Sequence, residues 1–242
     1  MSEKKDLIGR VHSIQSMGTL DGPGVRFVVF MQGCNLRCGC CHNPDTWSSV
    51  GGKEYTPEEL VSRAVRYREY FGKDGGVTVS GGEPLLQAEF VRELFRRCHD
   101  ADLNTCLDTS GSLLNEAVDG LLDETDRVLL DIKYTDDGLY RKHVGCSIDN
   151  PLRFLKRLNE KGIATTLRQV TIPTLNDTKD NVFALCDIAK AYPCVYKIEL
   201  LPFKKICQVK YDGMGISFPF ADLPTPTAES MLSLRELLGK YE

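Results

Sequence analysis

Short apolar runs rich in β-formers alternate with helical patterns along most of this chain. The runs are Arg26 to Met31, Val77 to Ser80, Asn104 to Asp108, Val128 to Ile132, Thr165 to Ile172 and Val195 to Leu201. Such alternation predicts βα units around a parallel sheet. Six units are fewer than the eight that close a (β/α)8 barrel. We therefore expect an α/β fold, an open, partial (β/α)6 TIM-like barrel, although a doubly wound open sheet also fits the periodicity.

Two helices are marked clearly. Thr56-Pro57-Glu58-Glu59 combines a Thr N-cap, Pro at the first helical position and Glu at the third, which predicts a capping box. The apolar stripe that follows it comprises Leu60, Val61, Ala64 and Val65. A second stripe, on one face of a later helix, comprises Phe90, Val91, Leu94, Phe95 and Cys98.

Composition is that of one folded domain. The 242 residues are 42% hydrophobic and 26% charged, enough for a sizeable core. We expect a single domain over 1–242, with additions at 1–25 and 204–242. The net charge of −4 argues against nucleic-acid binding, which needs a basic surface. The start of the chain has no apolar signal region and no stretch approaches a membrane span. We expect a cytoplasmic protein whose thiols stay reduced.

Cys34, Cys38 and Cys41 lie within eight residues. Three thiolates hold three corners of an iron–sulfur cube, one fewer than the usual four. The fourth iron is then open to a substrate, as in catalytic metal sites. Zinc would need a second ligand pair, but the other cysteines are scattered and no His-x3–5-His pair is present. Three cysteines at this spacing, followed by His42 and Asn43, resemble the radical S-adenosylmethionine (SAM) superfamily.

Polar residues recur where the predicted strands end, which is where barrel enzymes carry their sites. Each could serve an ordinary loop, but their joint position predicts one shared site. Gly82 allows close backbone approach, and Glu83 is a candidate acceptor for an ammonium group. Side chains suited to ribose hydroxyls and a carboxylate also occur, and SAM carries all of these groups. The segments are Ser80-Gly81-Gly82-Glu83-Pro84, Asp108-Thr109-Ser110-Gly111, Asp131-Ile132-Lys133, Arg168 and Leu201-Pro202-Phe203-Lys204.

From Ile8 to about Phe203 the chain resembles the activating enzymes of pyruvate formate-lyase. The matching stretches are GRVHSIQSMGTLDGPGVRFVVFMQGC, CHNPDTW, GGKEYT, VTVSGGEPLLQAEFVRELF, TCLDTSG, LLDIK and IELLP. The resemblance implies a radical SAM activase that reductively cleaves SAM to a 5′-deoxyadenosyl radical. This radical removes a hydrogen from a backbone glycine of pyruvate formate-lyase and leaves a glycyl radical there.

The same resemblance implies a set of site residues. One [4Fe–4S] cluster is expected on Cys34, Cys38 and Cys41. A monovalent cation is expected at Asp108, Thr109, Asp131 and the backbone of Leu129. The loop Asp21-Gly22-Pro23-Gly24 is expected to engage the partner's glycine segment. The expected SAM contacts are Cys40, Cys41, His42, Asn43, Gly81, Gly82, Glu83, Asp131, Ile132, Lys133, Arg168 and Lys204.

Two positions depart from the family pattern. Cys40 stands where the family has a larger aromatic or aliphatic residue, and Lys204 replaces a His expected to touch SAM. Residues 43 to 53 contain no cysteine, so a single cluster is expected rather than the ferredoxin-like module of other activators. Pyruvate formate-lyase is the expected partner, a flavodoxin or ferredoxin the expected electron donor, and a monomer the expected state.

Three alternatives remain open at this stage. The chain could activate a related 2-ketoacid lyase or another glycyl radical enzyme. It could be a non-catalytic iron–sulfur electron carrier or redox sensor, which predicts four protein ligands or an occluded iron. It could be a radical SAM enzyme for a small molecule, which would not need the Asp21 to Gly24 loop.

Overall fold

The structure, a computed structural model, describes residues 7–242. The first six residues of the predicted addition at 1–25 lie outside this range. The described chain forms one eight-stranded sheet with strand order β3-β1-β2-β4-β5-β6-β7-β8. Strand β1 (Gly9–Gly18) is antiparallel to its neighbours β2 and β3, and the remaining pairs are parallel. The other strands are β2 (Arg26–Met31), β3 (Lys53–Tyr55), β4 (Gly76–Gly81), β5 (Asn104–Thr109), β6 (Arg127–Asp131), β7 (Ala164–Thr171) and β8 (Val195–Pro202).

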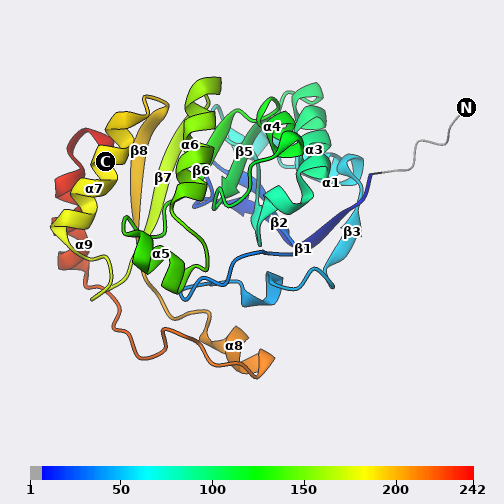
Figure 1. Ribbon diagram of the computed structural model, residues 1–242. Helices are drawn as coiled ribbons and strands as arrows, with labels where there is room; N and C mark the ends of the chain where they lie inside the picture. Colours follow the sequence, from blue (N-terminus) through cyan, green and yellow to red (C-terminus); the bar gives the residue numbers. More distant parts are fainter. Residues whose placement is uncertain (1–6) are drawn as a thin grey trace, which may run out of the picture.

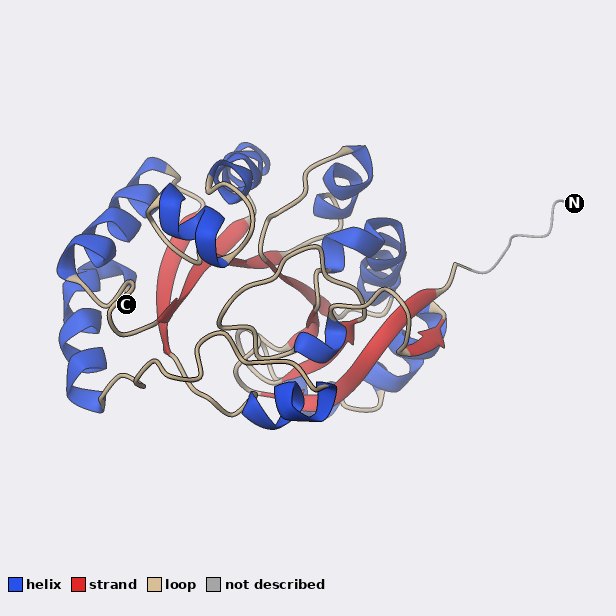
Figure 2. Cartoon of the chain, turned by 60° about the horizontal axis from the view of Figure 1, so that its bottom comes forward, coloured by secondary structure: helices blue, strands red, loops and turns tan. Residues whose placement is uncertain are grey.

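The six parallel strands are the six predicted ones, and the open barrel is confirmed. The sheet ends at β3 on one side and β8 on the other, so it does not close. Figure 2 shows the sheet curving, with most helices outside the curve. A doubly wound sheet would carry helices on both faces. Helices α3 (Ala88–Asp100), α6 (Asp149–Lys161) and α7 (Lys179–Ala191) contact β5, β6 and β8 respectively.

The helical layer begins as predicted (Figure 1). Thr56 caps α1, and Glu59 completes the capping box. Within α3 every residue of the predicted stripe is buried. In α1 the stripe is narrower than predicted, because Val65 is 38% exposed where the helix ends. The helices are α1 (Pro57–Val65), α2 (Arg68–Phe71), α3 (Ala88–Asp100), α4 (Glu116–Leu122), α5 (Asp137–His143), α6 (Asp149–Lys161), α7 (Lys179–Ala191), α8 (Gln208–Met214) and α9 (Ala228–Arg235); the 3₁₀ turns are η1 (Pro44–Thr46), η2 (Pro84–Gln87) and η3 (Glu236–Tyr241).

Two hydrophobic clusters organise the interior. The larger one fills the space between the sheet and its outer helices. The second, which we call the inner cluster, packs against the cysteine loop. Its members are Leu36, Cys40, Tyr134, Tyr140, Val144, Ile148, Ile172, Phe203, Cys207, Tyr211, Phe218 and Phe220. The site is therefore built on a packed wall rather than on free loops.

Both predicted additions join this framework. Described residues of the N-terminal addition form β1, a strand that the sequence reading missed because its exposed and half-buried residues are mostly polar. In the C-terminal addition, η3 packs against α7, α9 and β8, while α8 contacts η1 next to the cysteines. Among the helices of residues 7–242, none combines the length and apolarity needed to span a bilayer.

Candidate active site

A cavity of about 240 Å³ opens at the carboxyl ends of the six parallel strands. This is the position that the sequence predicted, and each of the six strands contributes at least one wall residue. The cavity is lined by Asp21, Phe30, Cys34, Leu36, Cys38, Cys40, Cys41, His42, Asn43, Trp47, Ser80, Gly81, Gly82, Asp108, Thr109, Ser110, Asp131, Lys133, Arg168, Val170 and Leu201. Most of the predicted site residues thus meet in one place.

The cysteine loop is held by backbone hydrogen bonds. The Arg37 and Gly39 amides donate to the carbonyls of Val144 and His143 at the end of α5, over 3.3 and 2.8 Å. Gln32, buried at the end of β2, donates to the carbonyls of Asp45 and Ser48. These bonds fix the loop before any ligand binds, which lowers the entropic cost of ordering a site.

The four cysteines of this loop differ in accessibility. All are free thiols, and Cys34, Cys38 and Cys41 are partly exposed while Cys40 is buried in the inner cluster. Burial raises the pKa of Cys34 to about 11 and that of Cys40 to about 11. Burial likewise raises the pKa of Cys38 and Cys41. The thiols are therefore protonated at neutral pH until a metal displaces the protons.

Gly81 and Gly82 are required by the chain itself. A Cβ at Gly82 would lie 2.1 Å from the Gly33 carbonyl oxygen, and Gly81 has φ +107°. The Gly82 amide donates to Met31 O over 3.0 Å, and the Glu83 amide donates to Gly33 O over 2.8 Å. The close backbone approach predicted for Gly82 is thus an approach to the start of the cysteine loop. The two glycines let this loop pack against the end of β4.

Glu83 does not line the cavity. Its carboxylate accepts from the Leu85 amide and the Thr109 hydroxyl, at 3.1 and 2.6 Å, on one oxygen. The other oxygen accepts from the amide and the hydroxyl of Ser110. Four donors fill the acceptor positions of a carboxylate. This buried side chain thus joins the ends of β4 and β5, and its role as an ammonium acceptor stays a prediction.

Charged side chains from β5, β6 and β7 converge on the opposite wall. Asp108 accepts from the Ser80 hydroxyl over 2.7 Å and pairs with Arg168 at 3.5 Å. Burial raises the pKa of Asp108, although Arg168 opposes this rise. Lys133 pairs with Asp131. Burial opposes the charge of Lys133, but Asp131 raises the pKa of Lys133 well above its usual value. The wall thus keeps fixed charges of both signs.

The Asp21 to Gly24 loop reaches the cavity through Asp21 alone. Gly22 and Gly24 have φ +127° and +68°, and a Cβ at Gly24 would lie 2.6 Å from the Gly75 amide nitrogen. Burial raises the pKa of Asp21, and the nearby Arg168 opposes this. Arg168 also donates to Leu20 O over 3.2 Å. Glycine is therefore needed to fold the turn against the barrel, which leaves Asp21 on the rim.

Other predicted residues lie outside the cavity wall. Ile132 is fully buried in the outer core. Leu129 is buried in β6, in register with Asp108. The side chain of Lys204 is exposed, but its carbonyl lies 2.9 Å from His42 Nε2. Lys204 thus contacts a cavity residue, His42, through its backbone and not through its side chain.

The sequence alone did not predict the contribution of α8 to the site. Lys210 donates to Asn43 Oδ1 and pairs with Asp45, at 2.8 and 3.0 Å. The Tyr211 hydroxyl donates to Cys41 O over 3.2 Å, and its ring meets Trp47 edge-on at 5.9 Å. The only local signal was the unusual mixture of aromatic and basic residues after Phe203. Helix α8 therefore clamps the cysteine loop from outside the barrel.

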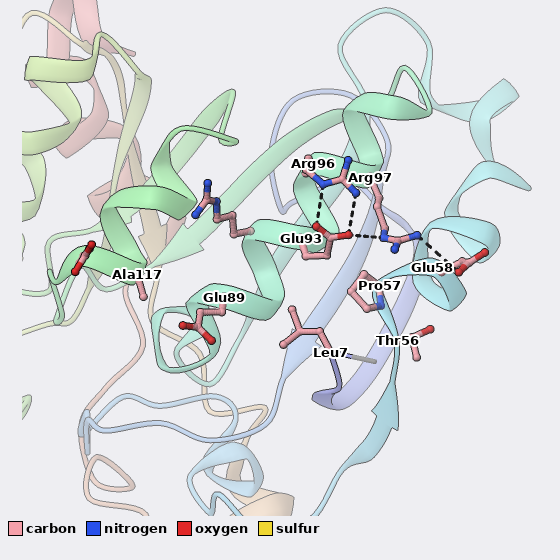
Figure 3. Close-up of a pocket in the computed structure, with 11 residues that line it drawn as sticks. Leu7, Thr56, Pro57, Glu58, Glu89, Glu93, Arg96, Arg97 and Ala117 are labelled. Carbon is pink, nitrogen blue, oxygen red and sulfur yellow. Dashed lines mark hydrogen bonds and ion pairs between the residues drawn. The ribbon is translucent and has the colours of Figure 1, made fainter. Parts of the chain in front are cut away.

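A larger depression, of about 890 Å³, lies on the outer helices (Figure 3). There Glu93 accepts from Arg96 and Arg97, and Arg97 also pairs with Glu58 at 3.7 Å. Exposed pairs of this kind contribute little to stability. None of the predicted site residues lines this depression, so we assign it to the charged helix surface.

The cavity fits the predicted cofactors in its donor chemistry. Three partly accessible thiols suit three irons of one cube. Within residues 7–242 no group of three or more His, Cys, Asp or Glu is arranged around a single ion. For SAM, Arg168 supplies a guanidinium on the cavity wall, and its buried Nε lies 3.4 Å from Glu199 Oε2 without forming a hydrogen bond. Lys133 and Asp131 supply a further donor and acceptor on the same wall.

Comparison with known proteins gives the family. Residues 28–186 match the family model of the radical SAM superfamily. The chain is 42% identical over 238 residues to the pyruvate formate-lyase 1-activating enzyme of Escherichia coli K12, covering 97% of both chains. It is 42% identical to the pyruvate formate-lyase-activating enzyme of Clostridium pasteurianum, again over 97% of both.

Solved structures agree on the fold. A domain of pyruvate-formate lyase-activating enzyme from Bacteroides vulgatus superposes with a TM-score of 0.57 at 24% identity, over 69% of this chain and 94% of that one. Streptococcus suis SuiB bound to S-adenosylmethionine gives 0.67 at 15% identity, over 86% of this chain and 45% of that one. The match to full-length relatives and the cavity at the strand ends lead to one conclusion: this chain is a radical SAM protein and belongs to the family of pyruvate formate-lyase-activating enzymes.

Proposed function

We propose that this chain activates pyruvate formate-lyase by forming a glycyl radical on it. The observation that carries the proposal is the shared cavity, in which the three predicted cluster thiols, most of the predicted SAM residues and Asp21 meet. One [4Fe–4S] cluster is held by Cys34, Cys38 and Cys41. Together, the bound cofactors supply an electron to the SAM sulfonium and a 5′-deoxyadenosyl radical that takes one hydrogen atom from the glycine.

The protein's part is to bind, orient and exclude water. Arg168 faces the SAM carboxylate, because it is the guanidinium that lines the cavity. Asp131 and Lys133 address the ribose hydroxyls from the end of β6. The backbone of Gly81 and Gly82 and the segment from Cys40 to Asn43 form the remaining SAM contacts. Ile132 supports this wall through its backbone, since its side chain is in the core.

A monovalent cation at the SAM carboxylate is part of the proposal. Its ligands are Asp108, Thr109, the Leu129 carbonyl and Asp131. The Asp108–Leu129 register pair joins two of these across β5 and β6. Asp131 also raises the pKa of Asp108, after burial, so the two carboxylates feel each other's charge. A cation there would relieve that repulsion.

Asp21, Gly22, Pro23 and Gly24 bind the partner's glycine segment. A glycine buried in a lyase must leave its own fold as an extended segment to reach this cavity. The Asp21 carboxylate on the rim and the backbone of the turn can hydrogen-bond such a segment. The electron donor is a flavodoxin or ferredoxin, and the activator acts as a monomer. Ten free thiols support a reducing compartment, the cytoplasm.

The test is a radical assay without oxygen. The reduced, cluster-loaded protein is incubated with SAM and pyruvate formate-lyase, and the glycyl radical is measured by electron paramagnetic resonance (EPR). We expect a radical on pyruvate formate-lyase that requires SAM. A radical formed only on a related 2-ketoacid lyase would change the partner. SAM cleavage with no radical on any lyase would point to a small-molecule substrate, and no SAM cleavage would leave an electron carrier or sensor.

A further inference from the structure

Three of the four unpaired buried polar atoms lie together beside the cysteine loop. Within residues 7–242 the buried side-chain atoms without a hydrogen-bond partner are Tyr134 OH, Tyr140 OH, His143 Nε2 and Arg168 Nε. Arg168 lines the cavity. The other three come from the segment after β6 and from α5. An unpaired buried hydroxyl is destabilising, so natural folds rarely leave one without a purpose. Such a group indicates an acceptor that binds later.

Tyr134 is placed directly against the cysteine loop. It is 2% exposed and belongs to the inner cluster with Cys40, against which Cys34 and Cys38 also pack. Its ring lies 5.7 Å from the His143 ring, and the His143 carbonyl accepts from the Gly39 amide, between Cys38 and Cys40. The aromatic stack and the loop are thus joined through one backbone bond.

The electrostatics agree with this placement. Burial raises the pKa of Tyr134, and a phenol is already protonated at neutral pH, so the Tyr134 hydroxyl can donate a hydrogen bond. A protonated thiol is a weak acceptor, whereas a metal-bound thiolate or a sulfide carries negative charge and accepts strongly. We therefore expect the acceptor for the Tyr134 hydroxyl to be a metal-bound thiolate or a sulfide.

We propose that the Tyr134 hydroxyl donates a hydrogen bond to a sulfur of the bound cluster and thereby raises its reduction potential. A donor at sulfur stabilises the added negative charge of the reduced cluster, and hydrogen bonds to sulfur are a known determinant of cluster potentials. The inference rests on the cluster of the proposed function. Tyr134 is a positioning residue that tunes the cluster and does not bind SAM. It follows Lys133 in the chain, so its replacement leaves the side chains that bind SAM in place.

The matched pair of variants is Tyr134→Phe and Tyr140→Phe. Both delete one buried hydroxyl from the same cluster, and the two rings meet edge-on at 6.4 Å. Burial raises the pKa of Tyr140, and a contact of its hydroxyl with the Lys133 backbone opposes that rise. The charge that most affects the pKa of Tyr140, after burial, is that of Lys133 rather than a cysteine. Reduction potentials are measured on the reconstituted proteins, without SAM, by redox titration followed by EPR. We expect a more negative potential in Tyr134→Phe and an unchanged one in Tyr140→Phe.

Melting of the cluster-free proteins provides the second measurement. Removing a hydroxyl that bonds to nothing costs no hydrogen bond, so Tyr134→Phe should melt no lower than the parent. An unchanged potential in a loaded Tyr134→Phe protein would overturn the inference. So would equal shifts in both variants, or a lower melting temperature of cluster-free Tyr134→Phe. A parent protein that takes up no cluster would overturn the proposed function as well, which separates the two failures.

Discussion

At the scale of single residues, the three cysteines predicted as cluster ligands differ in accessibility from Cys40. Cys40 sits inside the same short segment as the predicted ligands but is buried in the inner cluster. Cys34, Cys38 and Cys41 keep partial exposure on the cavity wall. A cluster that must meet SAM needs thiolates on the open side, and a thiol packed among aromatic rings behaves as a small hydrophobe.

Single alanine variants test this assignment. Replacing Cys34, Cys38 or Cys41 should remove the [4Fe–4S] cluster and with it essentially all SAM cleavage, because two thiolates do not hold the cube. Cys40→Ala should retain iron and sulfide at the parental ratio, as should Cys98→Ala, a control in the outer core. Iron and sulfide analysis after anaerobic reconstitution gives the answer. Loss of iron in Cys40→Ala together with its retention in Cys41→Ala would show that the ligand set is wrong.

At the scale of elements, β2 and β4 together hold the loop that is proposed to bind the partner. Arg26, fully buried at the start of β2, donates from Nε to the Thr78 hydroxyl over 2.9 Å. The hydroxyl of Thr78, in β4, in turn donates a hydrogen bond to Asp21 O over 2.7 Å. This relay ties the turn that carries Asp21 to the floor of the sheet. The loop geometry is therefore set by strand residues rather than by the turn sequence alone.

Thr78→Val removes the relay while keeping the shape of the side chain. It leaves Arg26 Nε and Asp21 O without their partner, so the free energy of unfolding should fall by about 1–3 kcal/mol. The looser loop should also raise the lyase concentration needed for half-maximal activation, with little change in SAM affinity. The control is Thr165→Val, a buried strand threonine that donates to Ile163 O far from the loop. Equal lyase dependence in the two variants would refute the role of the relay.

At the scale of the whole molecule, the open barrel makes room for a protein substrate. The sheet stops at β8 instead of closing onto its other edge strand, β3, and Asp21, in the β1–β2 connection, lines the cavity. A closed barrel is filled by its own side chains, whereas this arrangement admits an extended segment of another chain. Helix α8 completes the enclosure of the cysteine loop from the far side.

Asp21→Ala examines this arrangement as a whole. The variant should load its cluster and bind SAM like the parent, yet form at least about tenfold less glycyl radical, the effect of losing roughly 1.4 kcal/mol of partner binding in the range of a charged hydrogen bond. EPR of the activated lyase measures the radical. Thr19→Ala, an exposed residue of the same connection, should behave as the parent. Activation at the parental rate by Asp21→Ala would leave Asp21 a turn residue only.

The sequence by itself determined what neighbouring residues encode. The period of apolar residues predicted the six parallel strands and the α3 face, and Thr56 to Glu59 predicted the start of α1, because these signals depend on contacts within one turn or one strand. The cysteine spacing and the polar strand ends likewise predicted one rim, since parallel strands end together.

Only the tertiary structure decided what distant residues do for one another. The clamp of α8 joins Lys210 to Asn43, 167 positions away. Glu83 accepts hydrogen bonds from Thr109 and Ser110, and Gly82 packs against the backbone of the cysteine loop. Both residues therefore hold the fold together even without a ligand. Strand β1 exists because β2 and β3 supply its hydrogen bonds. Such partners are brought together when the sheet and its loops fold, and no local pattern records which side chain will bond to which acceptor.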